Sequence, residues 1–106
     1  DPAEVRVIQH ALGEEAAARV AVSATKSMHG HCMGATGALE AAITALALQE
    51  GLIPPTLNLW EVDEACVGVD HVANTARTAD VRIAVSTAFG FGGHNAILVL
   101  GRSEER

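Results

Sequence analysis

Hydrophobic residues near the start of the chain recur at the spacing of an α-helix. Val5, Ile8 and Leu12 would lie on one face of such a helix. Asp1 can cap its amino terminus. A proline follows in the first turn and a glutamate stands three residues after Asp1, and together the three residues form a carboxylate version of the capping box. Gly13 interrupts the pattern. The sequence therefore predicts a short amphipathic helix that ends at Gly13.

Two further patterns predict a strand and a long helix. The apolar run from Val20 to Ala24 is typical of a short buried strand. Lys26 would then lie at or just beyond the carboxyl end of that strand, where α/β proteins collect ligands. The longest helical pattern extends from Gly34 to Gln49, and Gly51 followed by Pro54-Pro55 would close it.

Polar residues on the predicted long helix form one narrow stripe. Thr36, Glu40 and Thr44 are four residues apart, and small or apolar residues cover most of the remaining circumference. This pattern predicts a helix that is buried nearly all round. In the alternative interpretation, the stripe simply faces water.

The second half of the chain predicts a loop region followed by a hairpin. Residues 56–80 are irregular and acidic, with one short extended piece near Val69 to Val72. Apolar alternation returns in "VRIAVSTA", and the glycine-rich turn "FGFGGHN" then leads into the apolar run "AILVL". These few elements cannot cover one another's hydrophobic surface. We therefore expect a part of a larger layered α/β body with a buried helix.

Composition narrows the functional classes. The chain has 106 residues, about one domain, and a formal charge of −6 with no basic cluster, which argues against nucleic-acid binding. Its longest apolar run is interrupted and shorter than the ~20 residues that span a bilayer. Cys32 and Cys66 form neither a CxxC pair nor a disulfide framework, which favours a reducing, cytoplasmic location. No targeting signal is visible, so either the chain is cytosolic or its true start lies upstream.

Lys26 and Glu40 form a candidate functional pair. Lys26 is the only lysine in the chain, whereas six arginines carry every other basic charge. Glu40 is the one carboxylate on a small and apolar helix surface, where an unpaired buried charge would be costly. We therefore expect the two side chains to interact.

His31 is a candidate hydrogen-bond donor. It precedes the long helix by three residues, where the helix dipole disfavours a positively charged imidazole. A neutral ring there could donate to developing negative charge. A metal site is the alternative, because His29 and Cys32 are close in sequence. Zinc would need further ligands, and the remaining cysteine and histidines match no known spacing, so we expect no metal.

The turn "FGFGG", residues 89–93, could approach a ligand closely. Its glycines, Gly90, Gly92 and Gly93, permit positive φ and leave the backbone accessible. A plain hairpin turn is the alternative interpretation. The turn matches neither the GxGxxG pattern nor the lysine-bearing phosphate loop, so nucleotide binding is not expected.

Four ordered motifs together resemble one family. The stretches "VSATKSMHGHCMGATGALEAA", "IPPTLNL", "VAN.AR" and "STAFGFGGHNA" are similar to the carboxyl-terminal portion of β-ketoacyl-[acyl carrier protein] synthases, closest to the type II elongating enzymes of fatty-acid synthesis. The resemblance covers nearly the whole chain. It implies a thiolase-like α/β fold, of which this chain is the last part of the carboxyl-terminal half, in a homodimeric parent enzyme.

The resemblance also implies an activity and residue roles. The family performs decarboxylating Claisen condensation between an acyl group on an enzyme cysteine and malonyl-carrier protein, without a cofactor. Lys26, Glu40 and His31 match the family's lysine, its glutamate partner and the second of its two active-site histidines. Phe91 matches the residue whose backbone N–H joins the oxyanion hole and whose ring gates the acyl pocket.

Several residues depart from the family pattern. His29 and His94 stand where threonine is usual, Cys32-Met33 where two aliphatic residues are usual, and Ala73 where proline is common. The nucleophilic cysteine and the first histidine belong to motifs upstream of this stretch, so the chain alone should not catalyse condensation. A polyketide-type ketosynthase fragment is one alternative. A non-catalytic module that packs on a partner half is another.

Overall fold

The computed structural model describes residues 1–103, which form two compact units. The first unit combines Asp1–Met28 with Pro54–Ala76. The second combines His29–Ile53 with the described residues from Arg77 onward. Each unit is built from segments that are distant in sequence. No helix within residues 1–103 is long and apolar enough to cross a membrane.

Helix α1 (Pro2–Leu12) begins the first unit and confirms the predicted amphipathic helix. Asp1 caps it, because its Oδ1 accepts a hydrogen bond of 3.0 Å from the Glu4 N–H. Gly13 ends it at a positive φ of 85° and donates to the Gln9 carbonyl. Val5 is its buried residue. The one-turn helix α2 (Glu14–Ala17) follows and packs against α1.

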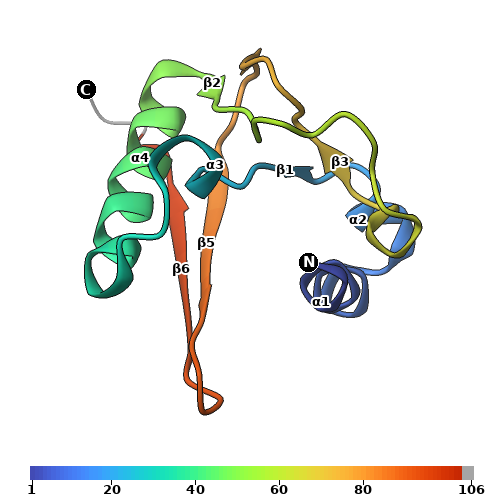
Figure 1. Ribbon diagram of the computed structural model, residues 1–106. Helices are drawn as coiled ribbons and strands as arrows, with labels where there is room; N and C mark the ends of the chain where they lie inside the picture. The colour runs from blue at the N-terminus through green and yellow to red at the C-terminus, as the bar shows by residue number, and fades with distance from the viewer. Residues whose placement is uncertain (104–106) are drawn as a thin grey trace. The chain divides into compact units, whose positions relative to one another are not determined.

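Strands β1 (Ala21–Val22) and β3 (Asp70–His71) pair in parallel in the first unit (Figure 1). The segment that contains β3 also bonds to Thr56 on its other side, through an N–H to carbonyl contact of 2.7 Å from Thr56 to Val72. Val72 lies between the two pairings and is only 1% exposed. The predicted strand at residues 20–24 is thus present but shorter, and Ala21 is exposed rather than buried.

Two short helical segments complete the first unit. Helix α3 (Lys26–His29) starts four residues after β1 and reaches the boundary of the unit. The 3₁₀ helix η2 (Glu64–Cys66) is capped by Asp63, whose side chain accepts from the Ala65 N–H. The predicted irregular region therefore contains the expected extended piece at β3 and an unexpected helical turn.

Helix α4 (Thr36–Glu50) and the hairpin of β5 (Ile83–Phe89) and β6 (Asn95–Gly101) dominate the second unit. The strands are antiparallel, which confirms the predicted hairpin, and Val85 lies opposite Val99. Figure 1 shows α4 running along the hairpin, and α4 packs against both strands. A 3₁₀ turn, η1 (Met33–Ala35), leads into the helix.

Burial of α4 differs from the sequence expectation. Only Thr36 and Leu48 are buried, whereas Leu46 remains 56% exposed within the described residues. The physical reason is that the hairpin is one layer and covers one side of the helix. The helix predicted to be buried nearly all round is therefore half-covered in this chain.

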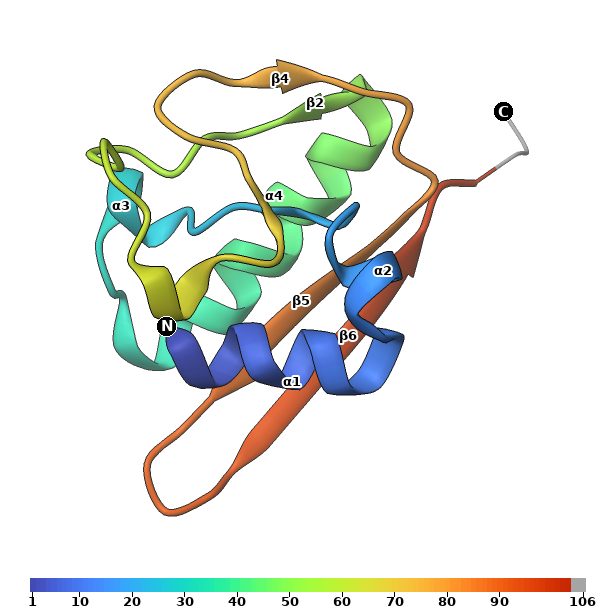
Figure 2. The same cartoon turned by 90° about the vertical axis from the view of Figure 1, so that its right-hand side faces the viewer.

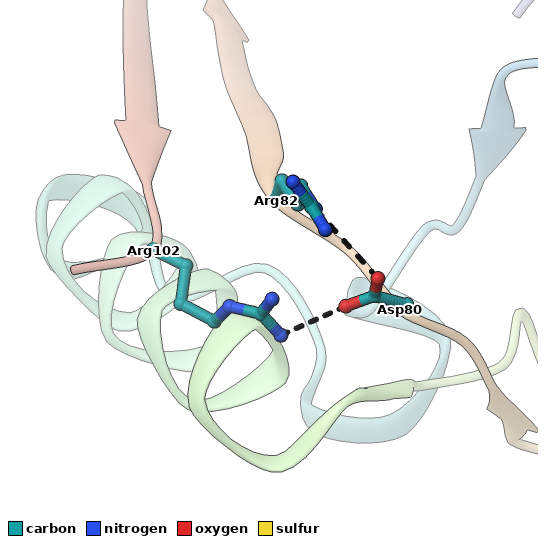
Figure 3. Close-up of polar contacts among 3 residues, drawn as sticks. All are labelled: Asp80, Arg82 and Arg102. Carbon is teal, nitrogen blue, oxygen red and sulfur yellow. Dashed lines mark ion pairs between the residues drawn. The ribbon is translucent and has the colours of Figure 1, made fainter. Parts of the chain in front are cut away.

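A glycine cap, a strand pairing and two ion pairs fix the end of α4 and the base of the hairpin. Gly51 adopts the left-handed conformation, with φ 65° and ψ 37°, and closes the helix as predicted. Strands β2 (Leu52–Ile53) and β4 (Arg77–Thr78) then pair antiparallel (Figure 2). Asp80 bridges Arg82 and Arg102 at the base of the hairpin, at 3.7 Å and 2.9 Å (Figure 3).

Candidate functional site

Lys26 lies at the first residue of α3 in a segment that side-chain hydrogen bonds hold in place. The Ser27 hydroxyl donates to the Ala24 carbonyl at 2.9 Å and accepts from the Leu57 N–H at 2.8 Å. The Ala24 N–H donates to Thr56 Oγ1 at 2.8 Å. The chain around Lys26 is thus fixed to the segment that follows the two prolines. Lys26 itself is half-buried in the first unit.

The His31 ring accepts hydrogen bonds at Nδ1. The Met33 backbone N–H donates to this nitrogen at 3.0 Å, and Thr36 Oγ1 lies 3.1 Å from it. A backbone N–H can only donate, so Nδ1 carries the lone pair and the ring proton lies on Nε2. The ring is exposed. The contacts therefore leave an N–H donor at Nε2, as the hydrogen-bond interpretation of His31 requires.

An uncommon backbone conformation creates this contact. Met33 has a φ of 51°, although it is neither glycine nor asparagine. Gly30, on the other side of His31, also has a positive φ, of 77°. The chain thus turns sharply on both sides of the histidine, and the second turn brings the Met33 N–H back to the ring.

Glu40 follows Thr36 by one turn of α4. Thr36 is 5% exposed, and Glu40 and Thr44 are half-buried. The Thr44 hydroxyl donates to the Glu40 backbone carbonyl at 2.7 Å. Within the described residues, the polar stripe is therefore buried at Thr36 and partly exposed at Glu40 and Thr44.

The glycine-rich turn is closed by a hydrogen bond of 2.6 Å from the Gly90 N–H to the His94 carbonyl. Gly92 and Gly93 have φ values of 83° and 84°, so the predicted use of positive φ is confirmed at both. The turn projects beyond the amino-terminal end of α4 (Figures 1 and 2), and Phe91 is fully exposed. Within residues 1–103, the Phe91 N–H donates to no other group.

The predicted site residues are divided between the two units. His31, Glu40 and Phe91 belong to the second unit, where Thr36 links the His31 ring to the helix that carries Glu40. Lys26 belongs to the first unit. The expected contact between Lys26 and Glu40 therefore stays a prediction.

The histidines and the cysteine near residue 30 do not gather into a ligand set. His29 Nδ1 lies 2.7 Å from the Gly30 carbonyl oxygen, and Cys32 Sγ lies 3.8 Å from the His29 and Gly30 carbonyl oxygens. Across residues 1–103, no three histidine, cysteine or acidic side chains are grouped so that they could hold a metal ion.

Thr36 is the residue of the site that sequence reasoning missed. The sequence pattern includes it in the polar stripe with Glu40 but gives no indication of its contact with His31. The spacing of five residues crosses a loop, a 3₁₀ turn and the start of a helix, and no periodic pattern spans such a path. The left-handed conformation of Met33 had no sequence signal, since methionine rarely adopts it.

Comparisons with known proteins find similar proteins over nearly the whole chain. Residues 1–60 match the family model described as "Beta-ketoacyl synthase, C-terminal domain". The 3-oxoacyl-[acyl-carrier-protein] synthase 2 of Vibrio harveyi is 46% identical over 105 residues, covering 99% of this chain and 25% of that protein.

Solved structures of β-ketoacyl synthases and related ketosynthases are also similar to this chain. The crystal structure of a β-ketoacyl synthase from Burkholderia phymatum superimposes with a TM-score of 0.89 at 39% identity, over 98% of this chain and 24% of that one. A type II PKS ketosynthase, solved in complex with its acyl-carrier protein and bound to the hexaketide, gives a TM-score of 0.88 at 27% identity. It matches over 95% of this chain and 24% of that one. The chain thus has the thiolase-like fold of ketosynthases and spans about a quarter of the length of the relatives it matches.

Proposed function

Because this chain belongs to the β-ketoacyl synthase family, we propose that it supplies the carboxyl-terminal part of a 3-oxoacyl-[acyl carrier protein] synthase active site. The parent enzyme would condense an acyl group with malonyl-carrier protein in fatty-acid elongation. This chain would form part of a single carboxyl-terminal domain and would need the remaining part of the synthase, which carries the nucleophilic cysteine.

The observation that carries the proposal is the proton arrangement on His31. Loss of carbon dioxide from the malonyl group leaves an electron pair that attacks the acyl thioester on the enzyme cysteine, and the cysteine thiolate then leaves. Negative charge builds on a thioester oxygen during both steps. An Nε2–H donor, set by the Met33 N–H at Nδ1, is suited to stabilise that oxygen. A well-placed donor of this kind contributes about 3 kcal/mol.

The other site residues take supporting roles in this proposal. The exposed Phe91 N–H would serve as a second donor to an oxyanion, and its ring would gate the acyl pocket. The turn glycines let this backbone approach a ligand without steric hindrance. Lys26, paired with Glu40, would orient and polarise the site. No cofactor or metal is needed for this chemistry.

Acyl carrier protein is the partner that we propose, in its acyl and malonyl forms. One solved ketosynthase similar to this chain was captured with its acyl-carrier protein. We further propose a homodimeric parent, as the family resemblance implies. A cytoplasmic location is proposed because both cysteines of the chain are free thiols.

The assay that tests the proposal uses the complete polypeptide that contains this chain. Carrier protein loaded with an acyl group and carrier protein loaded with a malonyl group are supplied together. Mass spectrometry then follows the product bound to the carrier. The proposal predicts a 3-oxoacyl thioester extended by the two retained malonyl carbons. Absence of both condensation and malonyl decarboxylation would contradict it and favour a non-catalytic module.

A polyketide-type ketosynthase is the second candidate, because the similar type II PKS ketosynthase holds a hexaketide. The same assay separates the two candidates when malonyl-carrier protein is in excess. A fatty-acid enzyme stops after one condensation until the 3-oxo group is reduced. Repeated extension of an unreduced chain would identify the polyketide activity instead.

A further inference from the structure

The Nδ1 atom of His31 has a second partner besides the Met33 backbone. Thr36 Oγ1 lies 3.1 Å from Nδ1, and the Met33 nitrogen lies 3.0 Å from it. The threonine is 5% exposed, whereas the imidazole is an exposed side chain. A buried hydroxyl on the first residue of α4 therefore contacts the nitrogen opposite the proposed donor.

The direction of this hydrogen bond follows from the backbone contact. Because the Met33 N–H points at Nδ1, that nitrogen has no proton to give. The Thr36 hydroxyl is therefore the donor in the 3.1 Å hydrogen bond. Both partners thus favour the same tautomer, with the ring proton on Nε2.

The position of Thr36 in α4 explains why its hydroxyl is available. A threonine within a helix commonly donates to the carbonyl four residues earlier, as Thr44 does to Glu40 at 2.7 Å. For Thr36, the first residue of α4, that residue is Cys32, which precedes the 3₁₀ turn η1 and lies outside the helix. The Thr36 hydroxyl is directed to the His31 ring instead.

The contact restricts the orientation of the ring. The second side-chain torsion of histidine has broad energy wells, and an exposed ring has few packing neighbours to narrow them. Threonine is β-branched and stiff, and α4 is a helix of 15 residues. A donor held by such an element fixes the plane of the imidazole more firmly than one exposed loop N–H alone.

We propose that Thr36 is a positioning residue for His31, which aims the Nε2–H by donating a second hydrogen bond to Nδ1. This inference rests on the proposed function, in which Nε2–H stabilises an oxyanion. Misaiming that donor weakens an interaction made chiefly in the transition state. Loss of the hydroxyl therefore lowers kcat and leaves KM nearly unchanged.

The kinetic test compares Thr36→Val with Thr36→Ser in the complete synthase. Valine keeps the shape without the hydroxyl, and kcat is expected to fall about 10-fold, at the lower end of the loss typical for groups that orient a functional histidine. Serine keeps the hydroxyl, so the kcat of Thr36→Ser should stay within about threefold of that of the natural enzyme. A small loss is expected because serine is not β-branched and holds its hydroxyl less firmly. Thr78→Val removes an exposed hydroxyl on β4, outside the proposed site, and it should leave kcat unchanged.

A spectroscopic test does not depend on activity. Histidine labelled with ¹⁵N is observed in the complete synthase, and the His31 signals are assigned by their loss in His31→Asn. The natural protein should show an unprotonated Nδ1 that accepts hydrogen bonds and a protonated Nε2. Thr36→Val should move the Nδ1 signal toward that of a less strongly bonded acceptor, and Thr36→Ser should restore it.

Three results would overturn the inference: a proton on Nδ1 in the natural protein, an unchanged Nδ1 signal and kcat in Thr36→Val, or a kcat loss that serine does not restore. The first is measured without any substitution, so a valine variant that fails to fold does not remove the test. If His31→Ala keeps full activity, the proposed role of His31 fails, while the Nδ1 signal still decides whether Thr36 bonds to the ring.

Discussion

The orientation of the His31 ring depends on an uncommon backbone conformation at Met33. A non-glycine residue with φ 51° is strained, at a cost of about 1–3 kcal/mol. In return, its N–H reaches His31 Nδ1 at 3.0 Å and sets the tautomer. Strain of this kind is common at functional sites, where the surrounding structure holds it in place.

Substitutions at Met33 should report this strain. Met33→Gly removes the steric conflict and little buried surface, since the side chain is 77% exposed. We expect the free energy of unfolding to stay level or to rise by up to about 1 kcal/mol. Met33→Val places a β-branched residue at positive φ and should lower it by at least about 1 kcal/mol. Urea denaturation measures both.

Met28 provides the matched control for this pair. It is also an exposed methionine, but it lies in α3, where glycine has only its entropic cost. Met28→Gly should lower the free energy of unfolding by roughly 0.5–1 kcal/mol. Equal losses in Met33→Gly and Met28→Gly would mean that Met33 is not strained.

Gly68 should tolerate no side chain. It has a φ of 113°, and an added Cβ would collide with the side-chain amide of Gln9. Gly68→Ala is expected to lower the free energy of unfolding by roughly 2 kcal/mol, from the backbone strain and the displaced glutamine together. The double variant with Gln9→Ala should recover the steric part only. Thermal unfolding measures the stability of the single and double variants. Full recovery of the free energy of unfolding in the double variant would contradict the backbone part of the explanation.

Residue type alone was enough to select Lys26, Glu40 and His31 as candidates, whereas Phe91 was selected through the family resemblance, and the roles of all four remain to be tested. It was not enough to find Thr36. The difference lies in what determines each contact: a charge or an imidazole is visible in the sequence, whereas a hydroxyl aimed at a ring depends on the path of the loop between them.

Elements that carry their own signals were predicted well. Helix α1 has a capping aspartate and a terminating glycine, α4 has a left-handed glycine at its end, and the hairpin has alternating strands around glycines. Strands β2 and β4 were missed, because each has only two residues and exists through its partner. Such pairings depend on contacts between distant segments, which no local pattern encodes.

The base of the hairpin offers a test of electrostatics at the level of elements. Asp80 contacts Arg102 at 2.9 Å and Arg82 at 3.7 Å, and side-chain exposures are 34% for Arg102 and 72% for Arg82. The Asp80–Arg102 pair is the shorter and less exposed of the two, so it should contribute more to the free energy of unfolding. Arg102→Gln is expected to lower the free energy of unfolding by up to about 1 kcal/mol, and Arg82→Gln by almost nothing.

Thermal unfolding at low and high salt checks this ranking. Added salt should reduce the Arg102→Gln effect, because screening weakens exposed ion pairs. An effect of Arg82→Gln that equals or exceeds that of Arg102→Gln would show that Asp80 does not act mainly through the shorter contact.

Apolar surface dominates the outer side of the hairpin in the whole molecule. Alternate residues of the two strands lie on the face away from α4, and their apolar side chains are exposed within the described chain: Ile83, Val85, Phe89, Ile97 and Val99. Part of α4 is exposed as well, including Leu46. An exposed and largely apolar face of this kind usually packs against another protein surface.

The 106-residue chain on its own should therefore self-associate. Sedimentation velocity over a range of concentrations should show oligomers or aggregates in place of one monomeric species. Val85 and Val99 are directly opposite on the outer face, so replacing both with threonine should reduce association without disturbing the strands. A stable monomer at high concentration would contradict this prediction.

At the scale of the whole molecule, the sequence motifs and the comparisons lead to the same family. Length, charge and periodicity predicted an incomplete α/β body but no reaction. The order of four motifs implied the reaction, since the first motif carries a lysine, a histidine and a glutamate, and the last, much later in the chain, carries a glycine turn. The structure adds the hydrogen bonds at His31 Nδ1, which place the ring proton of that histidine on Nε2.

The most direct test of this account is the condensation rate of the complete synthase with His31→Ala. If the Nε2–H stabilises the developing oxyanion, kcat should fall by about 10²–10³-fold in a protein that is still folded. Circular dichroism and thermal unfolding verify the fold. A folded variant that condenses acyl and malonyl groups at the natural rate would contradict the central claim.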